Sequence, residues 1–116
     1  MVRRSNLDRD WSEARAKCDA EGRCRAAADS QFPCSGPLQA AHVVFRGVDR
    51  VQEGPRGGLR TVVDPLDIVP LCQIHHIAYD GHRFDLLPFL TVDEQAKAVG
   101  HMGLERARRR ITGERA

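Results

Sequence analysis

The stretch VPLCQIHHIAYDGH, from Val69 to His82, carries one cysteine, three histidines and one aspartate in fourteen residues. The whole chain holds only five histidines, so this segment is enriched in side chains that bind metal ions. Its apolar first part predicts a short strand. From Cys72 the pattern predicts a helix that runs to about Asp80, where Gly81 can end it.

Helix geometry divides the metal-binding side chains of this segment into two sets. At about 100° per residue, Cys72 and His75 lie on one side of the helix, and His76 and Asp80 lie on a neighbouring side. A structural zinc ion takes four nitrogen or sulfur ligands and leaves no position open. Cys72 and His75 can supply two of the four.

The other two zinc ligands are expected from RCRAAADSQFPCSGP, residues 23–37, which is rich in turn-forming residues. Cys24 and Cys34 are the candidates, although the nine residues between them exceed the usual spacing of a zinc knuckle. Cys18 competes with either of them. Its alternative is to pack under Trp11 as a small apolar side chain.

His76 and Asp80 offer a nitrogen and an oxygen ligand on one face. Such a mixed pair suits an exchangeable divalent ion with open coordination positions better than a closed zinc site. The alternative is a solvated ion pair on a surface helix, which is common at a spacing of four residues.

The bulk properties limit the class of protein. A chain of 116 residues is expected to form one domain, and with 41% hydrophobic and 5% aromatic residues its core is thin, so a structural metal would help it. A net charge of +2 creates no strong overall field. No apolar run is long enough to span a membrane and no signal peptide is visible, so we expect a cytoplasmic protein without a membrane partner. In that compartment four cysteines favour metal ligation over disulfides.

The rest of the chain predicts an α+β fold. Residues 1–22 should contain a helix that ends at Gly22, and residues 38–45 a strand. Residues 46–60 are read as an exposed basic loop that could contact phosphates, and Thr91 with Glu94 forms a capping-box pattern at the start of a C-terminal helix. The arginines of that loop are Arg46, Arg50, Arg56 and Arg60.

LQAAHVV (38–44) together with DPLDIVPLCQIHHIAYD (64–80) resembles the motif of the HNH endonucleases, in particular their small zinc-stabilised phage and bacterial members. The resemblance implies a ββα-metal finger: a short β-hairpin and a helix around a catalytic metal ion, stabilised by a structural zinc. It covers residues 38–82, and Cys24 and Cys34 extend it toward the N-terminus. The expected organisation is a single HNH domain, 1–116, with an N-terminal helix in 1–22, a zinc-clipped core in 23–82 and a helical extension in 83–116.

The resemblance implies a role for each matching residue. His42 would be the general base that activates water, and Asp67 stands where the family has asparagine. His76, with Asp80, would bind the catalytic divalent ion, Mg, Mn, Ni or Zn. Cys72 and His75 match the second half of the structural zinc site, whose other ligands would be Cys24 and Cys34.

The chain departs from the family pattern at three positions. Ala41 stands where many members have a histidine or aspartate that also binds the metal. Asp67 keeps a side-chain oxygen that can orient His42 but adds a charge. Ala27 stands where a second zinc cysteine is expected, so Cys34 would replace it.

The expected function is metal-dependent hydrolysis of DNA phosphodiester bonds, by nicking or double-strand cleavage. A non-catalytic, zinc-stabilised nucleic-acid-binding module is the alternative, supported by Ala41, Asp67 and the basic segment ERARRR (105–110). A third reading is a phage packaging accessory that binds a terminase-type protein. The basic segment itself could equally be a solvated helix face.

Overall fold

The computed structural model describes residues 9–44, 50–53 and 57–114. Within them the chain forms four α-helices and two small sheets, which confirms the α+β class. The elements in chain order are β1 (Arg9–Asp10), α1 (Ser12–Glu21), β2 (Leu38–His42), β3 (Arg50–Glu53), β4 (Leu59–Val62), a 3-10 turn (Pro65–Asp67), β5 (Ile68–Cys72), α2 (Gln73–Asp80), a 3-10 turn (Leu87–Phe89), α3 (Val92–Met102) and α4 (Leu104–Thr112).

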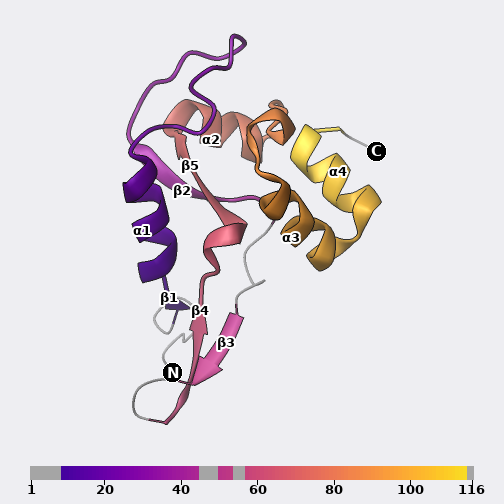
Figure 1. The fold of residues 1–116 in the computed structure, drawn as a ribbon. Helices are drawn as coiled ribbons and strands as arrows, with labels where there is room; N and C mark the ends of the chain where they lie inside the picture. The colour runs from indigo at the N-terminus through magenta and orange to yellow at the C-terminus, as the bar shows by residue number, and fades with distance from the viewer. Residues whose placement is uncertain (1–8, 45–49, 54–56, 115–116) are drawn as a thin grey trace, which may run out of the picture.

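The centre of the fold is the antiparallel pair of β2 and β5. Leu38 lies opposite Cys72, and His42 lies opposite Ile68. Every residue of β5 is buried, because α1 packs along one side of the pair while α3 and α4 lie on the other (Figure 1). Helix α2 follows β5 without a connecting loop, as the sequence predicts.

The turn after α2 differs in one detail from the expectation. The helix ends at Asp80 and Gly81 follows it, but Gly81 has an ordinary φ of −85°. The left-handed conformation is taken by His82, with a φ of 58°. This region of backbone space is unfavourable for residues with a side chain, so the turn after α2 is strained at His82.

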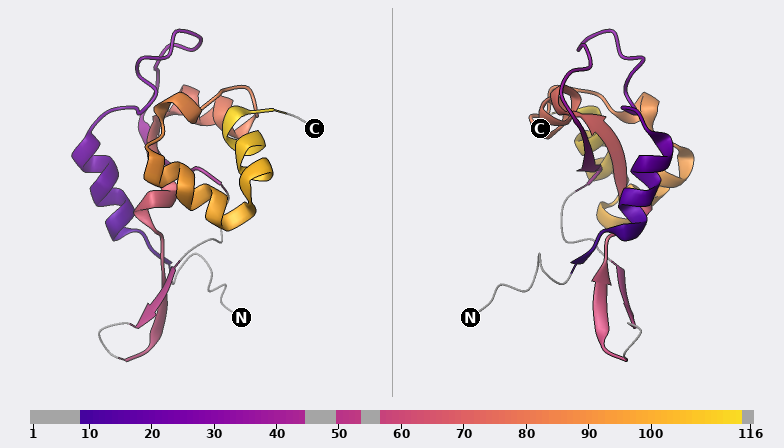
Figure 2. Two further views of the ribbon diagram at one scale, coloured as in Figure 1. Left: turned by 45° about the vertical axis from the view of Figure 1, so that its right-hand side comes forward. Right: turned by 90° about the vertical axis from the view of Figure 1, so that its left-hand side faces the viewer.

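The expected basic loop at 46–60 is wrong at residues 50–53 and 59–60, which belong to strands. β3 and β4 form an antiparallel hairpin, and β1 pairs in parallel with β4. The hairpin extends away from the helices, at the end of the molecule opposite α2 (Figure 2). Val51 and Leu59 are largely exposed on it, so the apolar residues of the hairpin do not mark a buried face. For this reason the sequence lacks the alternation of apolar and polar residues by which half-buried strands are recognised.

Helices α3 and α4 close the main core. Ala98, Ala107 and Ile111 pack in the same apolar cluster as Leu71 of β5 and Tyr79 of α2. The predicted capping box at the start of α3 is present in full, and Gly103, with a φ of 82°, separates α3 from α4. The described helices include none with the length and apolar character needed to cross a bilayer.

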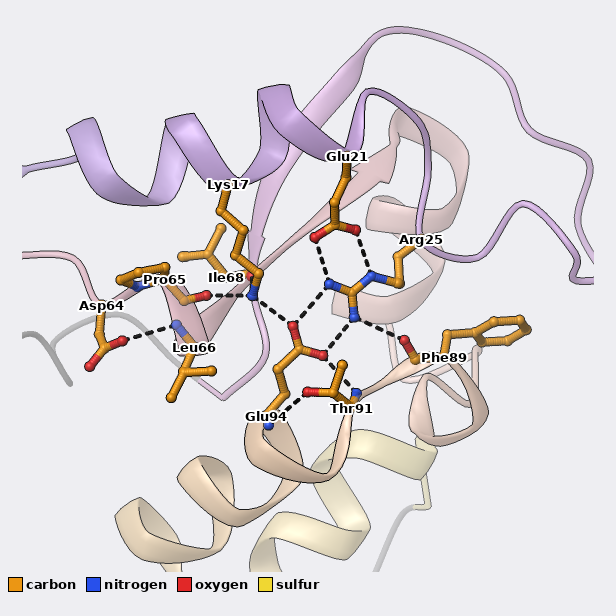
Figure 3. Close-up of polar contacts among 10 residues, drawn as sticks. All are labelled: Lys17, Glu21, Arg25, Asp64, Pro65, Leu66, Ile68, Phe89, Thr91 and Glu94. Carbon is orange, nitrogen blue, oxygen red and sulfur yellow. Dashed lines mark hydrogen bonds and ion pairs between the residues drawn. The ribbon is translucent and has the colours of Figure 1, made fainter.

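A buried carboxylate ties α1 to α3. Glu94 is 1% exposed and accepts hydrogen bonds from Lys17 at 2.6 Å and from both terminal nitrogens of Arg25 at 2.6 and 2.9 Å (Figure 3). Lys17 also donates to the carbonyl oxygens of Pro65 and Ile68. We call Lys17, Arg25 and Glu94 the Glu94 network. Its contacts join residues 17–25, 65–68 and 94, which are distant in the sequence. Arg25, which the network holds, is adjacent to Cys24.

Candidate metal centre and histidine cleft

Four side chains from three separate segments converge at the start of α2. The sulfur atoms of Cys24, Cys34 and Cys72 and a ring nitrogen of His75 all lie within 4.8 Å of one another. These are the four residues that the sequence predicts for one metal ion. Cys18 lies outside the group and packs against the small apolar cluster of Ala14, Val63 and Ile68, and none of the four cysteines is in a disulfide.

Backbone hydrogen bonds bring the two distant cysteines to α2. The N–H of Arg25 donates to the carbonyl of Pro70 at 2.7 Å, which holds the Cys24 turn against β5. The N–H of Ile74 donates to the carbonyl of Ser35 at 3.2 Å, which holds the residue after Cys34. Local sequence spacing gave no sign of these two contacts.

Cys72 has three roles at once. It is the last residue of β5, it caps α2 by accepting the N–H of His75 at 3.5 Å, and it belongs to the metal group. Burial raises the pKa of its thiol, but hydrogen bonds from the backbone N–H groups of His75 and Ser35 outweigh burial and lower that pKa. A thiolate is therefore favoured at this position, and thiolates are the form that binds metals.

The orientation of His75 also suits a metal ligand. Its Nε2 lies 3.0 Å from a carboxylate oxygen of Asp29, whose pKa is lowered because backbone N–H groups and His75 outweigh the effect of burial. An ionised Asp29 accepts the Nε2 proton, which leaves the lone pair on Nδ1. That Nδ1 lies 3.2 Å from the sulfur of Cys72 and 3.6 Å from those of Cys24 and Cys34.

These distances agree with tetrahedral coordination. Bonds of about 2.3 Å to sulfur and about 2.0 Å to nitrogen, at tetrahedral angles, separate the two ligand atoms by about 3.6 Å. Burial and the neighbouring thiols of Cys24 and Cys72 raise the pKa of Cys34 to about 12, because three adjacent thiolates repel one another unless a cation lies among them. The four residues are close enough to hold a metal ion.

A second cluster lines an open cleft of about 540 Å³ beside β2 and α2. Three of the five histidines contribute to it, one from the end of β2, one from α2 and one from the strained turn. The main side chains are Trp11, His42, His76, Asp80, His82 and Arg110. Two histidines from the opposite ends of the 38–82 segment therefore face the same space.

The two histidines of the predicted catalytic pair are held differently. The ring of Trp11 meets that of His42 edge to face, with centroids 5.3 Å apart and an angle of 86°. His76 has its Nδ1 2.7 Å from the side-chain oxygen of Gln39 and its Nε2 3.3 Å from a carboxylate oxygen of Asp80. Since the oxygen of Gln39 is an acceptor, Nδ1 carries the proton and the Nε2 of a neutral His76 has its lone pair free.

Asp67 is buried, and its carboxylate contacts α3. One oxygen lies 3.0 Å from the Nε2 of His101 and the other 3.4 Å from the ammonium of Lys97. Burial raises its pKa, and the contacts with Lys97 and His101 oppose that effect. The backbone carbonyl of Asp67, however, accepts the N–H of Val43 at 2.8 Å, immediately after His42.

The resemblance to HNH endonucleases rests on the residues themselves. No family model, curated protein or solved structure matches this chain. What bears on function is therefore the arrangement of the motif residues: the zinc-type cluster and the histidine cleft occupy two sides of α2, as the helical spacing predicts.

The predicted phosphate-contacting arginines are mostly not described. Arg46 and Arg56 lie outside the described residues, as does the side chain of Arg50 in β3. Arg60 lies in β4, where its guanidinium pairs with Asp10 at 2.9 Å and so fastens β4 to β1. Through this contact Arg60 stabilises the small sheet formed by β1, β4 and β3.

Sequence reasoning missed four residues of the cleft and its surroundings. Trp11 and Arg110 come from opposite ends of the chain, and Gln39 and His101 contact predicted site residues. Arg110 donates to the carbonyls of Val44 at 3.0 Å and Tyr79 at 3.1 Å, and to Asp80 at 3.2 Å. The signal for Arg110 was present in the basic segment 105–110, but its contact with Asp80 depends on how α4 packs.

Proposed function

We propose that this protein is a metal-dependent endonuclease that hydrolyses DNA phosphodiester bonds, and that β2, β5 and α2 form a ββα-metal finger. One observation carries the proposal: His42 and His76, which the HNH resemblance pairs, line one open cleft. The antiparallel pairing of β2 with β5 and the direct continuation into α2 agree with the architecture of such a finger.

His42 is the general base in this proposal. A neutral imidazole accepts a proton from water near physiological pH, and a positioned base of this kind contributes about 10²–10⁴-fold to a rate. Trp11 packs edge to face against the ring and supports it from one side. Asp67 positions His42 through its backbone carbonyl, which holds the residue that follows His42.

His76 and Asp80 hold the catalytic divalent ion. In neutral His76 the lone pair of Nε2 faces a carboxylate oxygen of Asp80 at 3.3 Å, and two acceptors at this distance repel unless a proton or a metal cation lies between them. Ligand atoms bound at about 2.1 Å in adjacent positions are about 3.0–3.4 Å apart, which the pair matches. When bound, such an ion neutralises charge that develops on the phosphate.

The second site holds a structural zinc ion in this proposal. Three thiols and an imidazole form a closed ligand set, and Asp29 orients the imidazole. The ion would join the Cys24–Cys34 segment to the junction of β5 and α2. The zinc ion would thus fix the start of α2, the helix that carries His76 and Asp80.

Cleavage of supercoiled plasmid tests the proposal. We expect the wild type to nick or cut it with magnesium, manganese or nickel, and the His42→Ala variant to be slower by about 10²–10⁴-fold. His76→Ala should lose metal-stimulated cleavage while retaining one zinc ion per chain, measured by elemental analysis. Added imidazole should restore part of the activity of His42→Ala, since it replaces the missing base.

Three results would count against parts of this proposal. If His42→Ala cleaves DNA as fast as the wild type, His42 is not the general base. Binding of DNA without scission under each divalent ion would favour the non-catalytic nucleic-acid-binding module. Loss of zinc from His76→Ala would show that the two metal sites are not separate.

A further inference from the structure

A second, smaller groove adjoins the histidine cleft. It has a volume of about 240 Å³ and shares His82 and Arg110 with the larger cleft. Its walls come from the turn after α2, the end of α3 and one face of α4. The lining side chains are His82, Met102, Arg106, Arg109, Arg110 and Glu114.

Three arginines of α4 share the face that borders this groove. Arg106, Arg109 and Arg110 follow the spacing of three and four residues that aligns side chains along a helix. Ala107 and Ile111 are buried beneath them in the main core, which fixes the rotation of α4. The arginine face is thus determined by packing.

The contacts of Arg106 and Arg109 leave their charges available to a ligand. Arg106 takes part in none of the ion pairs found among the described residues. Arg109 has one exposed pair, with Glu105 at 3.4 Å, and exposed pairs of this kind contribute little. Arg108 differs, because it is paired with both Glu105 and Glu114.

Arg110 connects the two cavities. Its guanidinium is stacked on the ring of Tyr79 at 4.1 Å and bonded to two carbonyls and Asp80, so it is fixed at the boundary. A polyanion that occupies the cleft beside His42 and His76 therefore lies next to the fixed guanidinium of Arg110, and the guanidinium groups of Arg106 and Arg109 lie beyond it along the groove. Side chains three or four residues apart on a helix, about 5–6 Å at Cβ, can reach the same or adjacent phosphates.

We propose that this groove is the exit path of the DNA substrate: the strand whose phosphate lies in the cleft continues across α4, where Arg106 and Arg109 bind its next phosphates. The inference rests on the proposed DNA substrate, but not on cleavage itself. The contacts are to the backbone, so they increase affinity for every sequence equally. Glu114 borders the same groove and opposes the ligand, which gives the proposal a second test of opposite sign.

The test is binding of a fluorescein-labelled DNA duplex, followed by anisotropy at several salt concentrations without added divalent ion. Arg106→Ala/Arg109→Ala should bind roughly tenfold more weakly, and the slope of log affinity against log salt should fall by about two, one for each phosphate contact. Glu114→Gln should bind more tightly than the wild type. Alanine favours helix, so α4 should persist, which circular dichroism checks.

The matched control is Arg15→Ala/Arg23→Ala, which removes the same net charge from exposed positions outside α4. Arg15 lies on α1, across the β2–β5 pair from α4 (Figure 1). This variant should keep most of the wild-type affinity, and a loss equal to that of the groove variant would reduce the effect to net charge and overturn the proposal.

The outcomes separate this inference from the nuclease function. If the wild type binds and cuts DNA but the groove variant binds it equally well, the exit path is wrong and the nuclease stands. If the groove variant loses affinity but no divalent ion supports cleavage, the binding surface stands and the nuclease fails. If the wild type does not bind the duplex, both are wrong.

Discussion

Replacing Cys34 by alanine is expected to release the zinc ion and to lower the free energy of unfolding by several kcal/mol. Cys34 is exposed, so its own packing contributes little, and an exposed substitution without such a role usually changes stability by no more than about 0.5 kcal/mol. Structural zinc can supply about 10 kcal/mol or more to a small domain, whose total stability is only about 5–15 kcal/mol. The measurements are the zinc content per chain and the denaturant midpoint.

Cys34 is a sharper test than its buried neighbours. Cys72 also caps α2, and a lost cap costs about 1 kcal/mol without any metal. The control is Cys18→Ala, at a partly buried cysteine outside the metal group, which should keep its zinc. A chelator should destabilise the wild type and Cys18→Ala strongly, and Cys34→Ala hardly at all. Retention of one zinc ion by Cys34→Ala would contradict the ligand assignment.

Replacing Glu94 by glutamine is expected to destabilise the protein by about 3 kcal/mol. Removing one partner of a buried ion pair typically costs about 3–5 kcal/mol, because the remaining charges are left uncompensated. The lower end applies here, since the side chains of Lys17 and Arg25 retain 21% and 16% exposure. Glutamine preserves the shape of the side chain, so the change isolates the charge. Urea unfolding at neutral pH measures the effect.

The same variant should change how stability depends on pH. Burial raises the pKa of Glu94, but the hydrogen bonds from Arg25 and Lys17 outweigh it and lower the pKa from 4.5 to about 2. A lowered pKa means that the carboxylate stabilises the fold above pH 4.5, and that this contribution is lost as the pH falls toward 2. The stability difference between the wild type and Glu94→Gln should therefore shrink over that interval. Acid release of zinc affects both proteins and cancels in the difference.

An exposed pair provides the control for Glu94. Glu105→Gln removes the partner of Arg108 at 2.9 Å on the surface of α4, where solvent screens the pair and it contributes little to stability. It should leave the pH dependence nearly unchanged. Equal effects of the two substitutions would show that the Glu94 network does not hold α1 to α3.

The sequence by itself determined the features that depend on local spacing. The strand that runs into a helix at Cys72, the capping box at Thr91 and the division of α2 into two faces all follow from residues within a few positions of one another. For that reason the sequence separates Cys72 and His75, which lie in the four-residue group, from His76 and Asp80, which line the cleft.

Only the tertiary structure decided that Cys24 and Cys34, and not Cys18, join the metal group, and which distant side chains complete the histidine cleft. The backbone contact of Arg25 with Pro70 brings Cys24 to the metal group, and the packing of α4 brings Arg110 to Asp80. The sequence identified Glu94 only as part of a cap, whereas its main partners come from α1 and the segment after it. Such contacts depend on how elements fold back across the β2–β5 pair, and no short-range pattern encodes them, because each partner is compatible with many neighbours until the core packs.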